Sequence, residues 1–171
     1  MKPITFSLQF RGITTAGAPG VLITRATAPS CSLVTEMDAD GVHGHFEPAP
    51  GDEAVLESRI LLAEDGRFHV TGAITFGHRH RLRFRSLDLG RLSLSPDLHL
   101  RHGSAISEIE EGHGQFVEAR GRITSNFFLS DTGEFTDNQL GLLFVAAPSA
   151  DDTTDDPRAS AAPAGGAPGP T

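Results

Sequence analysis

The chain has 171 residues, which suits one domain with its own hydrophobic core and is short for two. Its net charge of -8 argues against nucleic acid or an anionic membrane as the main partner, and no apolar run approaches the roughly 20 residues of a spanning helix. Cys31 is alone, which excludes an internal disulfide and fits a reducing compartment. We therefore expect a cytoplasmic protein, and the abundance of Arg, Ala, Gly and Pro suggests a GC-rich bacterial origin.

The N-terminal residues alternate in the way of a strand. Ile4, Phe6, Leu8 and Phe10 share one face, so this segment is a half-buried strand and lacks the apolar block of a signal peptide. Strand composition recurs along the chain, separated by Gly, Pro and Asp turn residues. The further strands that we expect lie at 21–27, 30–37, 41–47, 54–62, 68–76, 82–86, 104–111, 122–130 and 140–145.

These elements predict an all-β fold. No window offers a convincing amphipathic helix of ten residues, and turn signals recur about every 8–12 residues, as in sandwiches and barrels. Short antiparallel strands avoid exposed edges most simply by closing on themselves. We predict a single antiparallel β-barrel of about eight strands over residues 1–146, with a β-sandwich or jelly roll as the alternative. Residues 147–171 lack large apolar side chains and predict a disordered acidic tail rich in Ala, Pro and Gly.

A glycine-rich turn lies between two of the last predicted strands. Gly112, Gly114 and Gly121 punctuate it, and Phe116 is the large apolar side chain that can anchor it on a core. With Ala119, the pattern Gly-x-Gly-x-Phe-x-x-Ala-x-Gly resembles a turn of the allene oxide cyclase and dirigent-protein barrels, which include uncharacterised bacterial relatives. The resemblance implies the same barrel, and a cyclase or isomerase that acts on an apolar, oxygenated small molecule.

The segment around His78 and His80 has two interpretations. As one continuous strand, residues 74–86 place both imidazoles inward with Phe76 and Leu82, while the arginines of the segment face outward. As a hairpin with its turn at 77–80, the same segment places the histidines at the barrel rim. Strand lengths favour the hairpin, because a strand from 67 to 86 would be about twice the usual upper length.

A second histidine pair, His43 and His45, lies with Glu47 on one strand face. The pattern looks like part of a cupin metal motif, but the carboxylate spacing differs and a second motif is missing. Val42, Gly44 and Phe46 suit a buried face better, which leaves the histidines in solvent. We expect no metal and no cofactor.

Two functions fit these features. In the first, the apolar lumen of a barrel enzyme folds the substrate and a few polar groups move a proton or stabilise charge. Glu108, in phase with Ile106, is expected to point inward, and so is either Ser125 or Asn126. The catalytic candidates are His78, His80, Glu108 and Asn126, and the ligand-binding candidates are Phe76, Leu82, Phe84, Ser125 and Phe127.

In the second function the barrel is non-catalytic, lipocalin-like or dirigent-like, and binds a hydrophobic small molecule. The absence of a recognisable triad or complete metal motif favours this alternative. Both functions have a small-molecule partner and no nucleic acid or membrane. The oligomeric state stays open between monomer, dimer and trimer, although the barrels that the chain resembles often form trimers.

Overall fold

The computed structural model describes residues 1–146, in which the chain forms eleven strands and one short 3-10 helix. The predicted acidic tail, 147–171, lies outside the described residues. Over residues 1–146 no helix is long and apolar enough to cross a membrane. The elements are β1 (Lys2–Ala16), β2 (Val21–Ala28), β3 (Cys31–Asp38), β4 (Gly41–Pro48), β5 (Ala54–Leu62), β6 (Arg67–Phe76), β7 (His80–Ser86), β8 (Gly90–Leu94), β9 (Leu100–His113), η1 (Gly114–Phe116), β10 (Arg120–Ser130) and β11 (Glu134–Val145).

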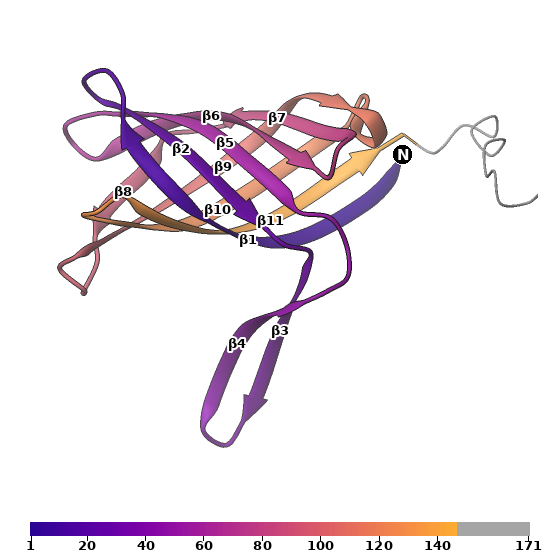
Figure 1. The fold of residues 1–171 in the computed structure, drawn as a ribbon, viewed down its shortest axis with the longest axis horizontal. Helices are drawn as coiled ribbons and strands as arrows, with labels where there is room; N and C mark the ends of the chain where they lie inside the picture. Colours follow the sequence, from indigo (N-terminus) through magenta and orange to yellow (C-terminus); the bar gives the residue numbers. More distant parts are fainter. Residues whose placement is uncertain (147–171) are drawn as a thin grey trace, which may run out of the picture.

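Eight of these strands close into an antiparallel barrel, in the order β1-β2-β5-β6-β7-β9-β10-β11 (Figure 1). The first and last strands, β1 and β11, pair over almost their whole length, and the pairing of β9 with β10 completes the ring. The predicted barrel is confirmed, and the sandwich alternative is wrong. Strand β8, which the sequence pattern did not reveal, pairs with β9 and with the start of β6 beyond the end of β7.

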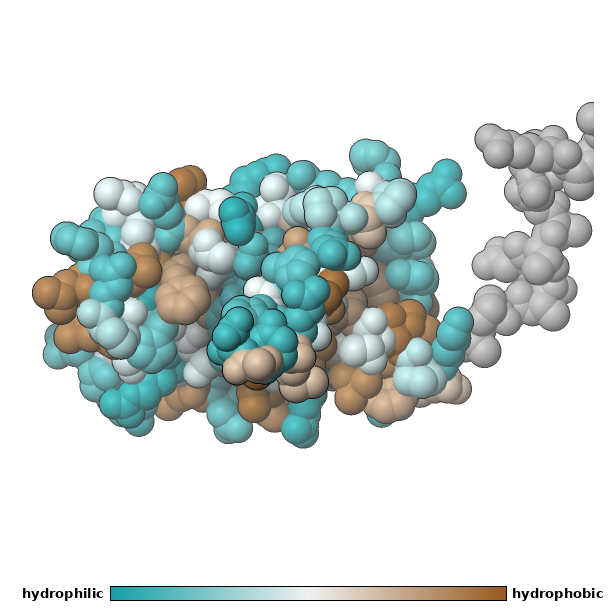
Figure 2. Space-filling view, turned by 90° about the horizontal axis from the view of Figure 1, so that it is seen from below, coloured by the Kyte–Doolittle hydropathy of each residue, from teal (hydrophilic) through white to brown (hydrophobic). Residues whose placement is uncertain are grey.

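Strands β3 and β4 form a separate hairpin, residues 31–48, which projects from the barrel and is called the arm below (Figure 1). The prediction that Val42, Gly44 and Phe46 lie on a buried face is wrong, since Val42 is 71% exposed and Gly44 is exposed. These residues do share a face, but the arm is no part of the barrel wall. Figure 2, seen from the side on which the arm projects, shows exposed hydrophobic residues among the polar ones.

The glycine-rich turn closes one end of the barrel. Strand β9 ends at His113, η1 follows, and the chain re-enters the wall at Arg120. Phe116 is 2% exposed and packs with Leu82, Leu143 and Val145, so its predicted anchoring role is confirmed. A second and larger cluster fills the rest of the barrel with the inward side chains of all eight wall strands.

Candidate functional site

A group of polar side chains lies inside the barrel. The inward positions of β11 alternate as Phe135, Asp137 and Gln139, so strand geometry alone places a carboxyl and an amide in the lumen. Asp137 is 2% exposed. Ser125, inward on the neighbouring β10, donates its hydroxyl proton to Asp137 Oδ1 at 2.7 Å, and Gln139 Nε2 donates to Asp137 Oδ2 at 2.7 Å. We call these three residues the lumen triad.

The environment of the lumen triad sets its acidity. Burial raises the pKa of Asp137 to about 6, against the hydrogen bonds from Gln139, Ser125 and the Asn126 backbone, which lower this pKa. Gln139 Oε1 is buried and has no hydrogen-bond partner among residues 1–146. The lumen therefore holds an acid that exchanges its proton near neutral pH and a carbonyl oxygen that is free to accept a hydrogen bond.

Beside the lumen triad is a cavity of about 20 Å³. This volume holds about one water molecule, so side chains otherwise fill this part of the lumen. Ser58 and Ser107 add two hydroxyls to its wall, and Leu56, Phe84 and Phe127 contribute apolar surface. Around the lumen triad the barrel interior is therefore polar, and side chains fill it except for this small cavity.

A larger hollow of about 290 Å³ opens at the barrel end where β6 turns into β7. Its floor and walls are apolar and its rim is polar, with His80, Asp52, Glu53 and Ser30 around Phe6, Leu8, Ala28, Ala54 and Phe76. We call this hollow the mouth pocket. Ala54 lines the mouth pocket and Leu56, the next inward residue of β5, lines the inner cavity. The two hollows are therefore neighbours along β5, and no residue lines both of them.

The hairpin interpretation of the His78 segment is confirmed. The turn is Gly77–Arg79, with β6 ending before it and β7 starting at His80, so residues 74–86 are not one strand. His78 is exposed in this turn. His80 is half-buried at the rim of the mouth pocket, and its Nδ1 accepts a hydrogen bond of 3.1 Å from the Gln115 backbone N–H.

Two other catalytic candidates lie on the outer wall. The expected inward orientation of Glu108 is wrong, because Ala105 and Ser107 take the inward positions of β9. Glu108 pairs with Arg85 at 2.8 Å, and this ion pair in solvent avoids the cost of placing the carboxylate in the lumen. Successive side chains of a strand point to opposite faces. Because Ser125 points inward, its neighbour Asn126 points outward and is exposed.

The ligand-binding candidates all face inward, although not at one place. Phe76 lines the mouth pocket, while Phe84, Ser125 and Phe127 line the inner cavity. Leu82 is fully buried against Phe116 in the closed end of the barrel.

The two central groups, Asp137 and Gln139, are not among the site residues predicted from the sequence. Their signal was present, because Phe135, Asp137, Gln139 and Leu143 keep one phase along a strand. The strand predicted from the sequence begins at residue 140, after these polar positions, and therefore does not include them.

The second histidine pair lies on the polar face of the arm. His43 Nε2 is 3.5 Å from Asp38 Oδ1 and His45 Nε2 is 3.2 Å from Glu47 Oε1, all in exposed positions. The expected solvated face is confirmed. Over the described range, no group of three or more His, Cys, Asp or Glu could hold a metal ion.

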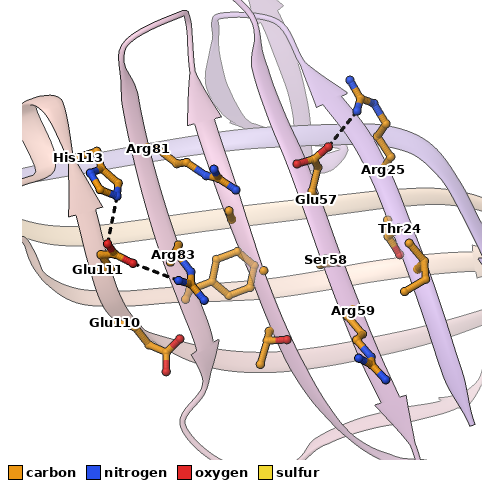
Figure 3. Close-up of a pocket in the computed structure, with 15 residues that line it drawn as sticks. Thr24, Arg25, Glu57, Ser58, Arg59, Arg81, Arg83, Glu110, Glu111 and His113 are labelled. Carbon is orange, nitrogen blue, oxygen red and sulfur yellow. Dashed lines mark hydrogen bonds and ion pairs between the residues drawn. The ribbon is translucent and has the colours of Figure 1, made fainter.

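The outer wall carries a broad surface hollow of about 730 Å³ over β2, β5, β6 and β7 (Figure 3). Arg25 of β2 pairs with Glu57 at 2.9 Å and Arg83 of β7 with Glu111 at 3.1 Å. Arg81, Arg83 and Arg85 are all exposed, which confirms that the arginines of β7 point outward. Charges of both signs alternate across this hollow, so it favours no ligand of one charge. We therefore place the candidate site in the lumen and at its mouth.

Fold and site together define a small closed β-barrel with a buried acid in its lumen and an apolar mouth. No family model matches the chain, and no curated protein matches it either. A solved structure of a pterocarpan synthase dirigent protein is similar, with a TM-score of 0.45 and 14% sequence identity, over 85% of this chain and 89% of that one.

Proposed function

We propose that the barrel binds an apolar, oxygenated small molecule at the mouth pocket and isomerises or cyclises it. The observation that carries this proposal is Asp137, a buried acid with a pKa of about 6 that lines a small lumen cavity next to an apolar pocket along β5. Such a pKa suits a general acid or base near neutral pH. The apolar pocket walls supply the binding energy and hold the molecule in a compact shape.

In the proposed reaction Asp137 takes a proton from a carbon next to the substrate's carbonyl group and returns it to another atom of the same molecule. The transfer consumes no second reactant, since Asp137 ends in the protonation state in which it began, and exchange of its proton with water before the return introduces solvent hydrogen into the substrate. Ser125 and Gln139 hold both carboxylate oxygens and so fix the direction in which Asp137 faces. Leu56 lines the inner cavity and follows Ala54 of the mouth pocket among the inward residues of β5, so we expect its side chain to change rotamer before the substrate reaches the carboxylate.

The test is proton exchange in D2O, followed by mass spectrometry on a panel of eight- to twelve-carbon ketones and enones. We expect the wild-type protein to exchange the α-hydrogens of at least one compound, and Asp137→Asn to do so about 100-fold more slowly. The matched control is Asp131→Asn, an exposed carboxyl on the β10–β11 turn. Equal exchange by wild type and Asp137→Asn would remove Asp137 from the reaction.

A second function, binding without catalysis, is favoured by the small size of the inner cavity, about 20 Å³. Here the ligand stays in the mouth pocket and never meets Asp137. Calorimetry with the same panel separates the two functions, because binding with no exchange establishes a carrier. We expect Ala54→Leu, which fills the pocket floor, to weaken binding about tenfold or more. The control, Ala63→Leu, makes the same change in an exposed turn.

Leu56→Ala is expected to join the mouth pocket to the inner cavity. Leu56 is 1% exposed, and removal of a buried leucine side chain costs about 2–5 kcal/mol of unfolding free energy. The same change should allow a longer ligand of the panel to bind, since it removes the inward side chain of β5 next to Ala54 of the mouth pocket. Urea unfolding measures the first effect and calorimetry the second. Unchanged ligand-length preference would show that Leu56 does not block the route.

A further inference from the structure

The arm presents an uncharged apolar face to solvent. In the register of its strands Leu33 lies opposite Phe46 and Met37 opposite Val42, so these four side chains share one face. Leu33 is 50% exposed, Met37 79% and Val42 71%. A lone two-stranded hairpin is marginally stable, and packing of its apolar face against another element stabilises it. Phe46 is half-buried near the barrel, while the other three stay exposed within residues 1–146 and form a surface that another molecule can cover.

The opposite face of the arm and its turn are acidic. Residues 31–48 contain four acidic residues and no Lys or Arg, which gives the arm a charge of -4 with neutral histidines. Glu36, Asp38 and Glu47 point away from the apolar face, since they occupy the alternate positions of the two strands. A partner of the arm therefore needs apolar side chains with positive charge beside them.

The barrel wall of the same chain offers such a surface. The outward positions of β11 include Leu140, Leu142 and Phe144, which are 50%, 50% and 44% exposed and which we call the β11 stripe. On the neighbouring β10, Arg122 lies opposite Leu142 and Arg120 opposite Phe144. The stripe therefore matches the arm in hydrophobicity and opposes it in charge.

We propose that the arm of one chain docks on the β11 stripe of a second copy, and that two copies exchange their arms reciprocally. An arm of eight-residue strands is about 26 Å long and about 10 Å wide, so one face covers roughly 250 Å². Two arms packed on each other would bury only about 500 Å², whereas two arms on two stripes bury about 1,000 Å², roughly the least area expected of a biological interface. The area therefore favours exchange over arm-to-arm packing.

The base of the arm rests on its own barrel, where Cys31 packs against the core. A hollow of about 350 Å³ lies at this junction, lined by Phe46 and Pro48 of the arm and by Gln9 and Arg11 of β1. Leu33, Met37 and Val42 stay exposed beyond the junction, so this outer part of the apolar face is available to the wall of another chain.

Sedimentation velocity of the full chain from 1 to 100 µM tests the proposal. We expect a dimer whose dissociation constant rises at least tenfold in Val42→Asp and in Leu142→Asp. The control is Leu98→Asp, an equally simple change at a residue that is 86% exposed in the β8–β9 connection, and it should leave the dimer intact. A wild-type protein that stays monomeric at 100 µM overturns the proposal.

Cross-linking then identifies the contact. Two chains are prepared on a Cys31→Ser background, one with Met37→Cys and the other with Leu142→Cys, and a short bis-maleimide is added to their mixture. Arm exchange predicts a cross-linked heterodimer as the main product. Cross-links mainly between two Met37→Cys chains would show arm-to-arm packing and contradict the exchange.

Discussion

Asp137→Asn is expected to abolish a decline in stability that the wild-type protein shows between about pH 4 and about pH 6. The pKa of Asp137 is raised from 3.8 to about 6 by burial, so the folded protein holds this proton at pH values where the unfolded chain has released it. Stability rises with pH only where the unfolded state binds more protons, and here the folded state binds more. The contribution of Asp137 is therefore fully present below about pH 4 and is lost as the pH rises through about 6.

The size of this effect follows from the shift. About two pKa units at 1.36 kcal/mol each give on the order of 3 kcal/mol, the amount by which the stability of wild type relative to Asp137→Asn should fall from pH 4 to pH 7. The asparagine keeps the Ser125 hydrogen bond, and a flip of the Gln139 amide lets the unpartnered Oε1 accept from the new amide. Urea unfolding of both proteins at four pH values measures the difference.

Two comparisons make the result specific. Asp131→Asn removes an exposed carboxyl and should follow the wild-type profile between pH 4 and pH 7. If wild type and Asp137→Asn also have parallel profiles, Asp137 titrates near its ordinary value and loses its suitability as a base at neutral pH. The proposed proton transfer would then lack its main support.

Gly112→Ala is expected to destabilise the barrel by about 3 kcal/mol or more, the range of severe overpacking. A Cβ at this position meets the carbonyl oxygen and carbonyl carbon of Phe116, which are backbone atoms and cannot turn aside. Relief of this clash has to move η1 and lift the Phe116 ring from Leu82 and Leu143. Both the closed end of the barrel and the neighbouring mouth pocket should loosen.

The matched control is Gly44→Ala in the arm, where an added Cβ has no atom within 4 Å. This variant should change the unfolding free energy by less than about 0.5 kcal/mol, as surface substitutions do. Thermal and urea unfolding compare the three proteins. A Gly112→Ala protein as stable as Gly44→Ala would mean that the turn adjusts freely and does not fix the barrel end.

The wall strands could be recognised from the sequence because alternation is a local property. Ile123, Ser125 and Phe127 keep one phase, and the structure places all of them inward. Closure of the sheet into a barrel could also be predicted from the sequence, since a series of short antiparallel strands has few other ways to cover its edges. The pattern Gly-x-Gly-x-Phe-x-x-Ala-x-Gly likewise located the turn that Phe116 anchors.

The site could be predicted only in part. The inward orientation predicted for Glu108 is wrong, and the choice between Ser125 and Asn126 stayed open, because a two-residue period states which residues share a face and not which face is inside. Asp137 and Gln139 escaped notice because polar residues at inward positions contradict the pattern by which an inner face is recognised. Asp137 also depends on a hydrogen bond from Ser125, which lies on another strand and cannot be paired with it from the sequence pattern.

The sequence by itself thus determined the strand segments, the closed antiparallel fold and the turn at Gly112, all of which depend on neighbouring residues. Only the tertiary structure decided that residues 31–48 leave the wall as an arm, since their alternation is the same in a barrel and in a free hairpin. Only the tertiary structure placed Asp137 beside Ser125 and raised its pKa, because burial and partners across strands depend on how the barrel closes.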